Sequence, residues 1–331
     1  MHYRQLGQTE LKISELSYGT WAIGGSWGKT NDEESLRALD VAIDQGVNFF
    51  DTADVYGDGH SEELLAQATK GKEDQIYIGS KFCRAGDIFS KDTYSKEQVK
   101  TYVENSLKRL QRERLDLYQI HCPPIEILKD GQVFQVLDEL QAEGKIRHYG
   151  VSVESVEEGL LCLEQPNVAA LQVIFNLLRQ KPLDTLLPEA KKKGVGIIAR
   201  VPLASGLLTG KFTKEHTFET GDHRHFNKDG EALMWAKHLV ANLTRELIWS
   251  KRSHGVKVVS HLSNAALRWI LDQDEVTTVI PGFKTVDQVK RNLEALSVPA
   301  FSEAELNKVN EFIRIECMSI FEGLIDFKFT G

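Results

Sequence analysis

The chain has 331 residues, of which 41% are hydrophobic and 27% charged, and its formal net charge is −8; these values are ordinary for a globular protein with a large core and argue against a general nucleic-acid binder. None of its four cysteines forms a C-x-x-C pair, so we expect neither a zinc ribbon nor a disulfide framework. No apolar run approaches the roughly 20 residues that span a bilayer and no apolar signal core follows Met1, so we expect a cytoplasmic protein without a membrane partner.

Short apolar runs alternate along the chain with longer amphipathic segments. Residues 1–12 are predicted to form a polar hairpin that caps the bottom of a barrel. The predicted strands follow at 13–18, 47–50, 76–78, 115–120, 149–151, 170–174, 196–199 and 277–280. Between them, apolar residues at helical spacing predict helices at 33–45, 95–110, 130–144, 188–194 and 286–296. Ser95 is the expected N-cap of the second of these helices.

This alternation predicts an α/β protein with a parallel sheet, and about eight units favour a closed (β/α)8 TIM barrel over an open sheet. The chain shows no linker or low-complexity run, so residues 1–331 are assigned to a single domain. Two parts depart from the repeat: an extended loop with an extra helix at 203–255, and a C-terminal helix and tail at 300–331. Long loops on the face formed by the strands' carboxyl ends are usually functional or disordered.

Polar side chains follow three neighbouring strands at this face, where barrels of this kind place their chemistry. Asp51 and Tyr56 follow the strand at 47–50, Lys81 follows 76–78, and His121 follows 115–120. Each residue alone has an ordinary explanation as a solvated charge, a packed ring or a structural hydrogen bond. Together they suit proton delivery to a carbonyl: the ammonium lowers the phenol pKa from about 10, the carboxylate holds the ammonium, and the imidazole orients the substrate oxygen.

Over about residues 3–315, the sequence resembles the aldo-keto reductase family. The strongest motif is Asp51-Thr52-Ala53-x-x-Tyr56-Gly57-x-Gly59-x-Ser61-Glu62, and further matches follow in the family's order at 80–81, 116–121, 144–152, 206–211 and 280–282. The resemblance implies a catalytic tetrad of Asp51, Tyr56, Lys81 and His121, in which Tyr56 is the acid. It also implies hydride transfer from NADPH to a small aldehyde or ketone, without a metal.

Two stretches are predicted to hold the cofactor phosphates. Residues 202–211 offer glycines, hydroxyls and a cation to a pyrophosphate, and 282–285 open a helix whose N-terminus favours an anion. Lys284 at that N-terminus favours NADPH over NADH, unless it is merely solvated. By resemblance, Ser152 and Gln172 would hold the nicotinamide carboxamide, Gln288 and Asn292 the adenosine half, and Arg224 would close over the cofactor. The expected cofactor-contacting residues are Gly19, Thr20, Trp21, Asp51, Ser152, Gln172, Arg200, Pro202, Leu203, Ser205, Gly206, Leu208, Lys211, Arg224, Gly282, Lys284, Gln288 and Asn292.

The predicted substrate pocket is less specific, because each of its wall residues could equally belong to the core. Its members are Trp21, Trp27, Tyr56, Phe82, His121 and Cys122. Two departures from the family pattern also lie near the nicotinamide: Val153 where many relatives have Asn, and Arg200 where an aromatic ring commonly stacks. Either Arg200 turns towards a phosphate or a substrate anion, or the nicotinamide is held differently here.

Two other functions are compatible with parts of this pattern. A regulatory protein on the same barrel could bind the cofactor with little turnover, and Arg200 and Val153 are the residues that favour it. An unrelated barrel enzyme acting on a phosphorylated substrate would need only the two phosphate stretches. The reductase is preferred because all four tetrad residues are present.

Overall fold

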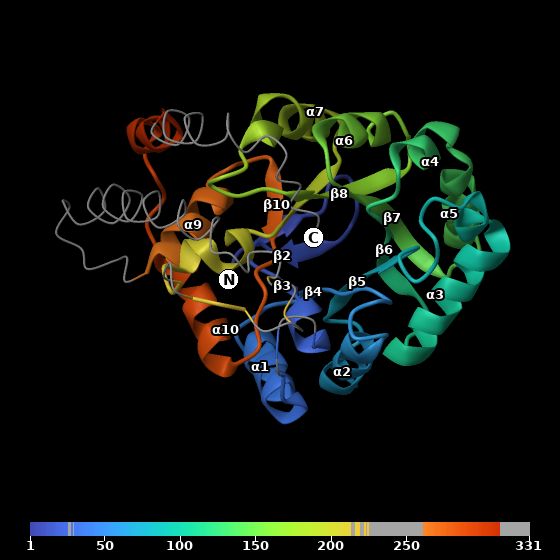
Figure 1. Cartoon of the computed structure of the whole chain (residues 1–331), viewed down its shortest axis with the longest axis horizontal. Coiled ribbons are helices and arrows are strands. Elements are labelled where there is room, and N and C mark those ends of the chain that lie inside the picture. The colour runs from blue at the N-terminus through green and yellow to red at the C-terminus, as the bar shows by residue number, and fades with distance from the viewer. Residues whose placement is uncertain are drawn as a thin grey trace.

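The computed structural model describes residues 1–25, 28, 30–212, 216–218, 222, 224 and 261–311. At its centre, eight parallel strands pair in chain order from β3 to β10. These strands are β3 (Tyr18–Gly19), β4 (Phe49–Asp51), β5 (Tyr77–Phe82), β6 (Leu115–His121), β7 (Ile146–Val153), β8 (Val168–Ile174), β9 (Gly196–Arg200) and β10 (Val276–Val279). The helices form an outer layer around them (Figure 1).

The two ends of this sheet meet, as the predicted barrel requires. Parallel bridges join Leu16 to Val279 and Gly19 to Gly282. The backbone N–H of Ser17 donates to the carbonyl of Val279 at 2.9 Å. The strands therefore form a nearly closed α/β barrel, so the predicted fold class is confirmed.

Within the described residues, the outer layer contains the five predicted helices and four others that the sequence pattern did not reveal. The predicted helices are α1 (Asp32–Asp44), α3 (Lys96–Leu110), α5 (Gln132–Ala142), α7 (Leu186–Lys193) and α10 (Val286–Leu293), and the others are α2 (His60–Thr69), α4 (Ile125–Asp130), α6 (Val156–Cys162) and α9 (Leu262–Leu271). Ser95 caps α3 by accepting from the backbone N–H of Gln98, as expected. Thr285 caps α10 in the same way through Gln288.

An antiparallel hairpin closes the bottom of the barrel. Its strands are β1 (Tyr3–Gln5) and β2 (Lys12–Ser14). Leu6, Leu11 and Ile13 are fully buried and pack in one cluster with Phe49 and Leu117 from the barrel strands. Because this end is filled with apolar side chains, any ligand must enter from the opposite face.

The predicted strand at 13–18 is wrong in one respect, because its two ends belong to different sheets. Ile13 pairs with Arg4 in the hairpin, whereas Tyr18 pairs with Phe50 in the barrel. An apolar run does not reveal which partner each of its residues pairs with, so the break was not apparent from the sequence.

The segments expected at 203–255 and 300–331 lie mostly outside the described residues. Their described parts include the 3-10 helix η4 (Ala204–Thr209) and helical backbone at 303–311. Within the described ranges, no helix is both long enough and apolar enough to cross a membrane.

Candidate active site

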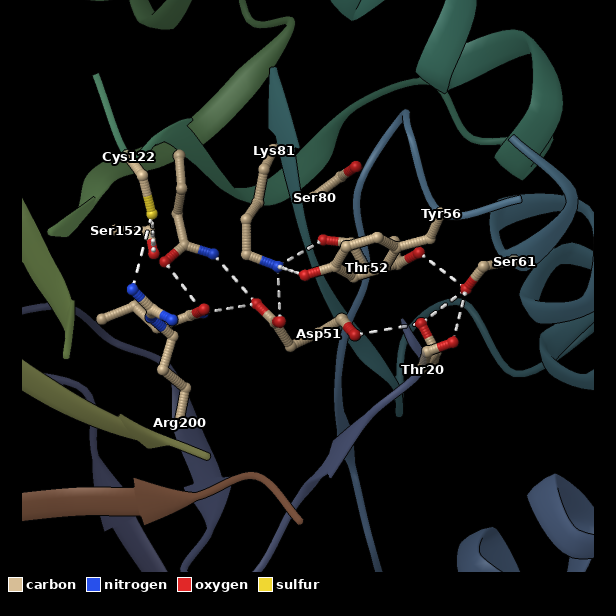
Figure 2. A network of polar contacts seen from close by, with 12 residues as sticks. Thr20, Asp51, Thr52, Tyr56, Ser61, Ser80, Lys81, Cys122, Ser152 and Arg200 are labelled. Carbon is tan, nitrogen blue, oxygen red and sulfur yellow. Dashed lines mark hydrogen bonds and ion pairs between the residues drawn. The ribbon is translucent and has the colours of Figure 1, made fainter. Parts of the chain in front are cut away.

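The carboxyl ends of β4 and β5 bring three of the four predicted catalytic side chains into direct contact. Lys81 is fully buried, and its Nζ donates to Asp51 Oδ1 at 2.6 Å and to the Tyr56 hydroxyl at 3.2 Å (Figure 2). The same ammonium donates to the carbonyl of Thr52 at 2.8 Å. These three bonds fix the cation between the carboxylate and the phenol.

Tyr56 lies between two other predicted site residues. Its ring stacks on Trp21 with centroids 5.7 Å apart and planes 17° apart. The ring of His121 meets it edge-on, with centroids 5.8 Å apart and planes at 84°. The phenol is therefore held on both sides, and the fourth tetrad member is its immediate neighbour.

Burial and neighbouring charges set the protonation states of these groups. Burial raises the pKa of Tyr56, although the Lys81 ammonium opposes it, so the phenol holds its proton at neutral pH. Burial would lower the pKa of Lys81, but Asp51 and Tyr56 outweigh it and raise that pKa. Burial, together with the charges of Lys81, Arg84 and Arg200, lowers the pKa of His121 well below its ordinary value. The site thus contains a neutral phenol, an ammonium and a neutral imidazole.

Two glutamines complete the hydrogen bonds of Asp51. Gln119 and Gln172 each donate an amide N–H to Asp51 Oδ2, at 3.0 Å and 2.7 Å. Gln172 was predicted to hold the nicotinamide, and the structure shows its Nε2 already bonded to the carboxylate. Gln119 was missed, although it lies two residues before His121 and thus on the same face of β6.

A chain of buried hydroxyls supports Asp51 from the other side (Figure 2). Thr20 Oγ1 donates to the carbonyl of Asp51 at 3.0 Å, and the hydroxyl of Ser61 donates to Thr20 Oγ1 at 2.6 Å. The hydroxyls of Ser61 and Thr52 lie 2.9 Å apart. This chain joins α2 to the ends of β3 and β4, so Thr20 supports the site from behind.

Two further carboxyl groups are buried near the tetrad. Glu62 is fully buried and accepts from Arg109 Nε at 2.7 Å and from the hydroxyl of Ser80. Burial and the charge of Glu62 raise the pKa of Asp54 to about 7. Neither carboxyl oxygen of Asp54 meets a hydrogen-bond partner in the described part of the chain. Asp54 therefore holds its proton more strongly than an ordinary aspartate does.

A cavity of about 630 Å³ opens at this face of the barrel. Its wall contains most of the predicted site residues: Gly19, Trp21, Asp51, Tyr56, His121, Gln172, Arg200, Pro202, Leu203, Ser205, Gly206, Lys211, Arg224, Gly282, Lys284, Gln288 and Asn292. Residues separated by more than 200 positions in the sequence thus line one space.

Some predicted residues do not line this cavity. Five of them are buried behind its wall: Lys81, Thr20, Ser152, Leu208 and Cys122. The hydroxyl of Ser152 lies 3.4 Å from Cys122 Sγ. Phe82 stacks on Tyr118 with ring centroids 4.8 Å apart. Side chains alternate along a strand, so the neighbour of inward-facing Lys81 must point to the helices; Phe82 is a core residue, and its placement in the pocket is corrected. Trp27 lies outside the described residues.

The wall also contains residues that sequence reasoning missed. They are Ala22, Val55, Arg84, Val201, His261, Ser263, Ile280, Pro281 and Arg291. Several of them directly flank predicted residues, so a wider window around each strand end would have found them. His261 and Ser263, at the start of α9, had no such signal.

One end of the cavity suits a nucleotide with several phosphates. Ala204, Ser205 and Gly206 in η4 have positive φ values of 48°, 55° and 96°, a backbone arrangement that forms anion-binding concavities. Lys211, Lys284 and Arg291 line the same cavity. The chemistry of these donors therefore fits a nicotinamide dinucleotide.

Comparison with known proteins gives the same picture over the whole barrel. The sequence profile of the aldo/keto reductase family matches residues 15–314. Aldo-keto reductase YhdN of Bacillus subtilis is 35% identical over 307 residues, which cover 90% of this chain and 88% of YhdN. The NADH-specific methylglyoxal reductase of Escherichia coli is 27% identical, covering 92% and 96% of the two chains. The structure of the glycerol dehydrogenase AKR11B4 from Gluconobacter oxydans superposes with a TM-score of 0.78 at 27% identity, covering 95% of each chain.

Proposed function

Since the chain belongs to the aldo-keto reductase family of oxidoreductases, we propose that it reduces an aldehyde or ketone to the alcohol, with a nicotinamide cofactor as hydride donor and Tyr56 as proton donor. The observation that carries this proposal is the pair of contacts from the buried Lys81 Nζ, at 2.6 Å to Asp51 and 3.2 Å to Tyr56. A scaffold that only bound the cofactor would have no need of a buried cation on a cavity-lining phenol.

The cofactor supplies the hydride when it is bound, and the chain's own residues deliver the proton. Tyr56 holds that proton at neutral pH because burial raises its pKa. As negative charge develops on the carbonyl oxygen, the phenol donates its proton there, and the Lys81 ammonium stabilises the phenolate that remains. His121 is neutral, so it can donate a hydrogen bond to the carbonyl oxygen without competing as an acid. Asp51 keeps the ammonium in place.

We further propose NADPH as the preferred cofactor, with NADH as the alternative. Lys284 precedes the N-cap of α10 and lines the cavity, and burial together with the charge of Arg224 lowers its pKa, although Asp222 opposes that shift. Gln288 anchors this turn by accepting from the backbone N–H of Lys284 at 2.6 Å. The 2′-phosphate of NADPH would add a charge-assisted contact for Lys284 and Arg291, which line the cavity at this end, whereas NADH offers no such group.

The test is a carbonyl panel assayed with NADPH and NADH in parallel, followed by Tyr56→Phe. The wild-type protein should oxidise NADPH with activated aromatic aldehydes, and Tyr56→Phe should lower kcat by about 10²–10⁴. Tryptophan fluorescence measures how tightly each of the two proteins binds NADPH. This measurement distinguishes a loss of catalysis from a loss of cofactor binding. Full activity in Tyr56→Phe would refute the proton donor, and tight NADPH binding without turnover on any carbonyl would favour the regulatory alternative.

A further inference from the structure

Arg200 occupies the catalytic end of the cavity. It is the last residue of β9, it is only 8% exposed, and it lines the cavity together with Tyr56 and His121. Its Nη2 donates to the carbonyl of Val153 at 3.2 Å. The same Nη2 lies 3.5 Å from Cys122 Sγ (Figure 2). Its Nε has no hydrogen-bond partner among the residues that the structure describes. The guanidinium is thus fixed at one corner while a buried donor remains without an acceptor.

The direction of this side chain separates it from the proposed phosphate site. Val153 and Cys122 lie at the ends of β7 and β6, whereas η4 and α10 follow β9 and β10 on the other side of Arg200 in the strand order. The guanidinium therefore reaches towards the tetrad and away from the cations at η4 and α10. Of the two roles left open by the sequence, a contact with a cofactor phosphate is the less compatible with this geometry.

Positive charge accumulates around Arg200. Arg84 lines the same cavity and donates from Nε to the carbonyl of His121 at 3.3 Å. Burial and the charge of Arg200 lower the pKa of Arg179, so that guanidinium lies close as well. Glu154 is close to both Arg84 and Arg179, but its side chain is more than a third exposed and its carboxylate is 3.7 Å from Arg84. Asp51 offsets none of them, because its oxygens already accept from Lys81, Gln119 and Gln172.

We propose that the carbonyl substrate carries a carboxylate, which Arg200 binds with the help of Arg84 while the carbonyl oxygen lies at Tyr56. This inference rests on the proposed reductase function and names its substrate class. A guanidinium presents its donors in a planar fork that matches the two oxygens of a carboxylate. A buried donor without an acceptor is unfavourable, and a charge-assisted bond from a carboxylate removes that cost while it selects for acids.

The experiment compares acids with their own neutral esters. The two pairs are phenylglyoxylate with methyl phenylglyoxylate, and 4-carboxybenzaldehyde with methyl 4-formylbenzoate, which place the carboxylate near to and far from the carbonyl. For at least one pair, wild-type kcat/KM should be at least tenfold higher for the acid than for the ester. In Arg200→Gln the acid-to-ester ratio should fall at least tenfold, chiefly through KM of the acid, and Arg200→Lys should lose less. The matched control Arg37→Gln, on exposed α1, should keep the wild-type ratio.

A binding measurement provides a readout that does not depend on turnover. With NADP⁺ present, benzoate should quench the tryptophan fluorescence of wild type at least tenfold more tightly than benzamide does, and Arg200→Gln should remove that difference. Ionic strength should weaken benzoate binding more than benzamide binding.

The outcomes separate this inference from the proposed function. Reduction of the esters with no preference for either acid would overturn the carboxylate and leave the reductase intact. If Arg200→Gln lowers kcat/KM equally for acid and ester and also weakens NADPH binding, the carboxylate proposal is overturned. Arg200 would then contact the nicotinamide instead. No turnover of any acid, ester or other carbonyl would refute the reductase on which the inference rests.

Discussion

The two halves of the cavity are built in different ways. At the ends of β4, β5 and β6, the charged groups are matched within the chain: Lys81 Nζ bonds to Asp51, Tyr56 and the Thr52 carbonyl. At the ends of β9 and β10, the wall instead gathers cations, namely Arg200, Lys211 and Lys284. The difference shows that the protein prepares the proton-delivery half by itself, whereas the other half presents cations to a ligand in the cavity.

Backbone strain is common to both halves. Cys83, Cys122 and Val201 directly follow β5, β6 and β9, and their φ values are 91°, 52° and 52°. Such conformations cost about 1–3 kcal/mol each and persist only where the surroundings enforce them. The ends of these three strands, beside the cavity, are thus places where the fold tolerates strain.

Replacing Lys81 by Met should have the largest effect on the proton-delivery half of the cavity. We expect kcat for carbonyl reduction to fall by about 10²–10⁴ and the free energy of unfolding to fall by about 3–5 kcal/mol, because Asp51 is then buried without its cation. Single-turnover kinetics and urea unfolding measure the two effects. The double variant Asp51→Asn/Lys81→Met removes both charges, so it should regain stability but no activity. Near wild-type turnover in Lys81→Met would refute the proposed role of this cation.

Asp54→Asn tests the buried carboxyl group of this half whose pKa is raised. The pKa of Asp54 is raised from 3.8 to about 7 in the folded protein, so the folded state binds the proton more tightly and its stability falls as pH rises from about 4 through 7. The permanently neutral Asn should therefore stabilise the protein at pH 8 by up to about 4 kcal/mol, and the gain should shrink at pH 5. Urea unfolding at both pH values measures it, with exposed Asp58→Asn in the same loop as the control. A gain independent of pH would contradict this assignment.

Lys284→Met tests the ligand-dependent half. Loss of a charge-assisted contact of about 1.5–3 kcal/mol should weaken the Kd of NADPH by about 10–100-fold and that of NADH much less. Fluorescence titration with both cofactors measures the ratio. Lys290→Met, exposed on the same helix α10, is the matched control and should leave the ratio as it is. Equal weakening for both cofactors would remove the support for a 2′-phosphate.

Gly57→Ala tests how rigidly the Tyr56 loop is seated. The new Cβ would lie 2.2 Å from the carbonyl oxygen of Gly24, at a φ of +65°. Gly71→Ala is the control, since its φ is +75° but nothing lies within 4 Å of the new Cβ. The free energy of unfolding should fall by about 1–2 kcal/mol in both variants, because alanine disfavours the left-handed backbone conformation. In Gly57→Ala it should fall by about 1–3 kcal/mol more because of the clash. Equal losses of Tm would mean that the loop adjusts without cost.

The pH profile of kcat/KM should show the smallest effect. Tyr56 must be protonated to act, and burial raises its pKa above the ordinary value of 10.0. The activity should therefore fall only at a pH above that value. The pKa of His121 lies well below 6.5, so its titration should not appear near neutrality. We therefore expect a profile that is flat within a few-fold from pH 6.5 to 9. An alkaline limb near pH 8 that disappears in Tyr56→Phe would show that the charge of Lys81 outweighs burial.

The site was predictable where chemistry follows directly from residue type and strand order. Asp51, Tyr56 and Lys81 were expected together because parallel strands end at one face. Ser152 was expected at the cofactor and Phe82 in the pocket, but both lie behind the cavity wall. Sequence position alone does not say which side of the barrel wall a side chain faces. Successive side chains of a strand point to opposite sides, so Phe82 must face away from the cavity if Lys81 faces it; the pocket assignment of Phe82 did not apply this rule.

Other features depend on contacts between distant segments. Gln119 and Gln172 meet at Asp51 across 53 positions of sequence, and the hydroxyl chain joins Thr20 to Ser61 across 41. No local sequence pattern predicts contacts between residues so far apart in the chain.

The order of strands and helices, and the kinds of polar side chain at each strand end, were determined by the sequence itself, because hydrophobic periodicity and residue chemistry are local properties. The tertiary structure alone decided that Arg200 turns to Val153 and Cys122, that Tyr56 keeps its proton and that His121 is neutral. Those outcomes depend on burial and on the distances between charges, which exist only once the barrel has closed.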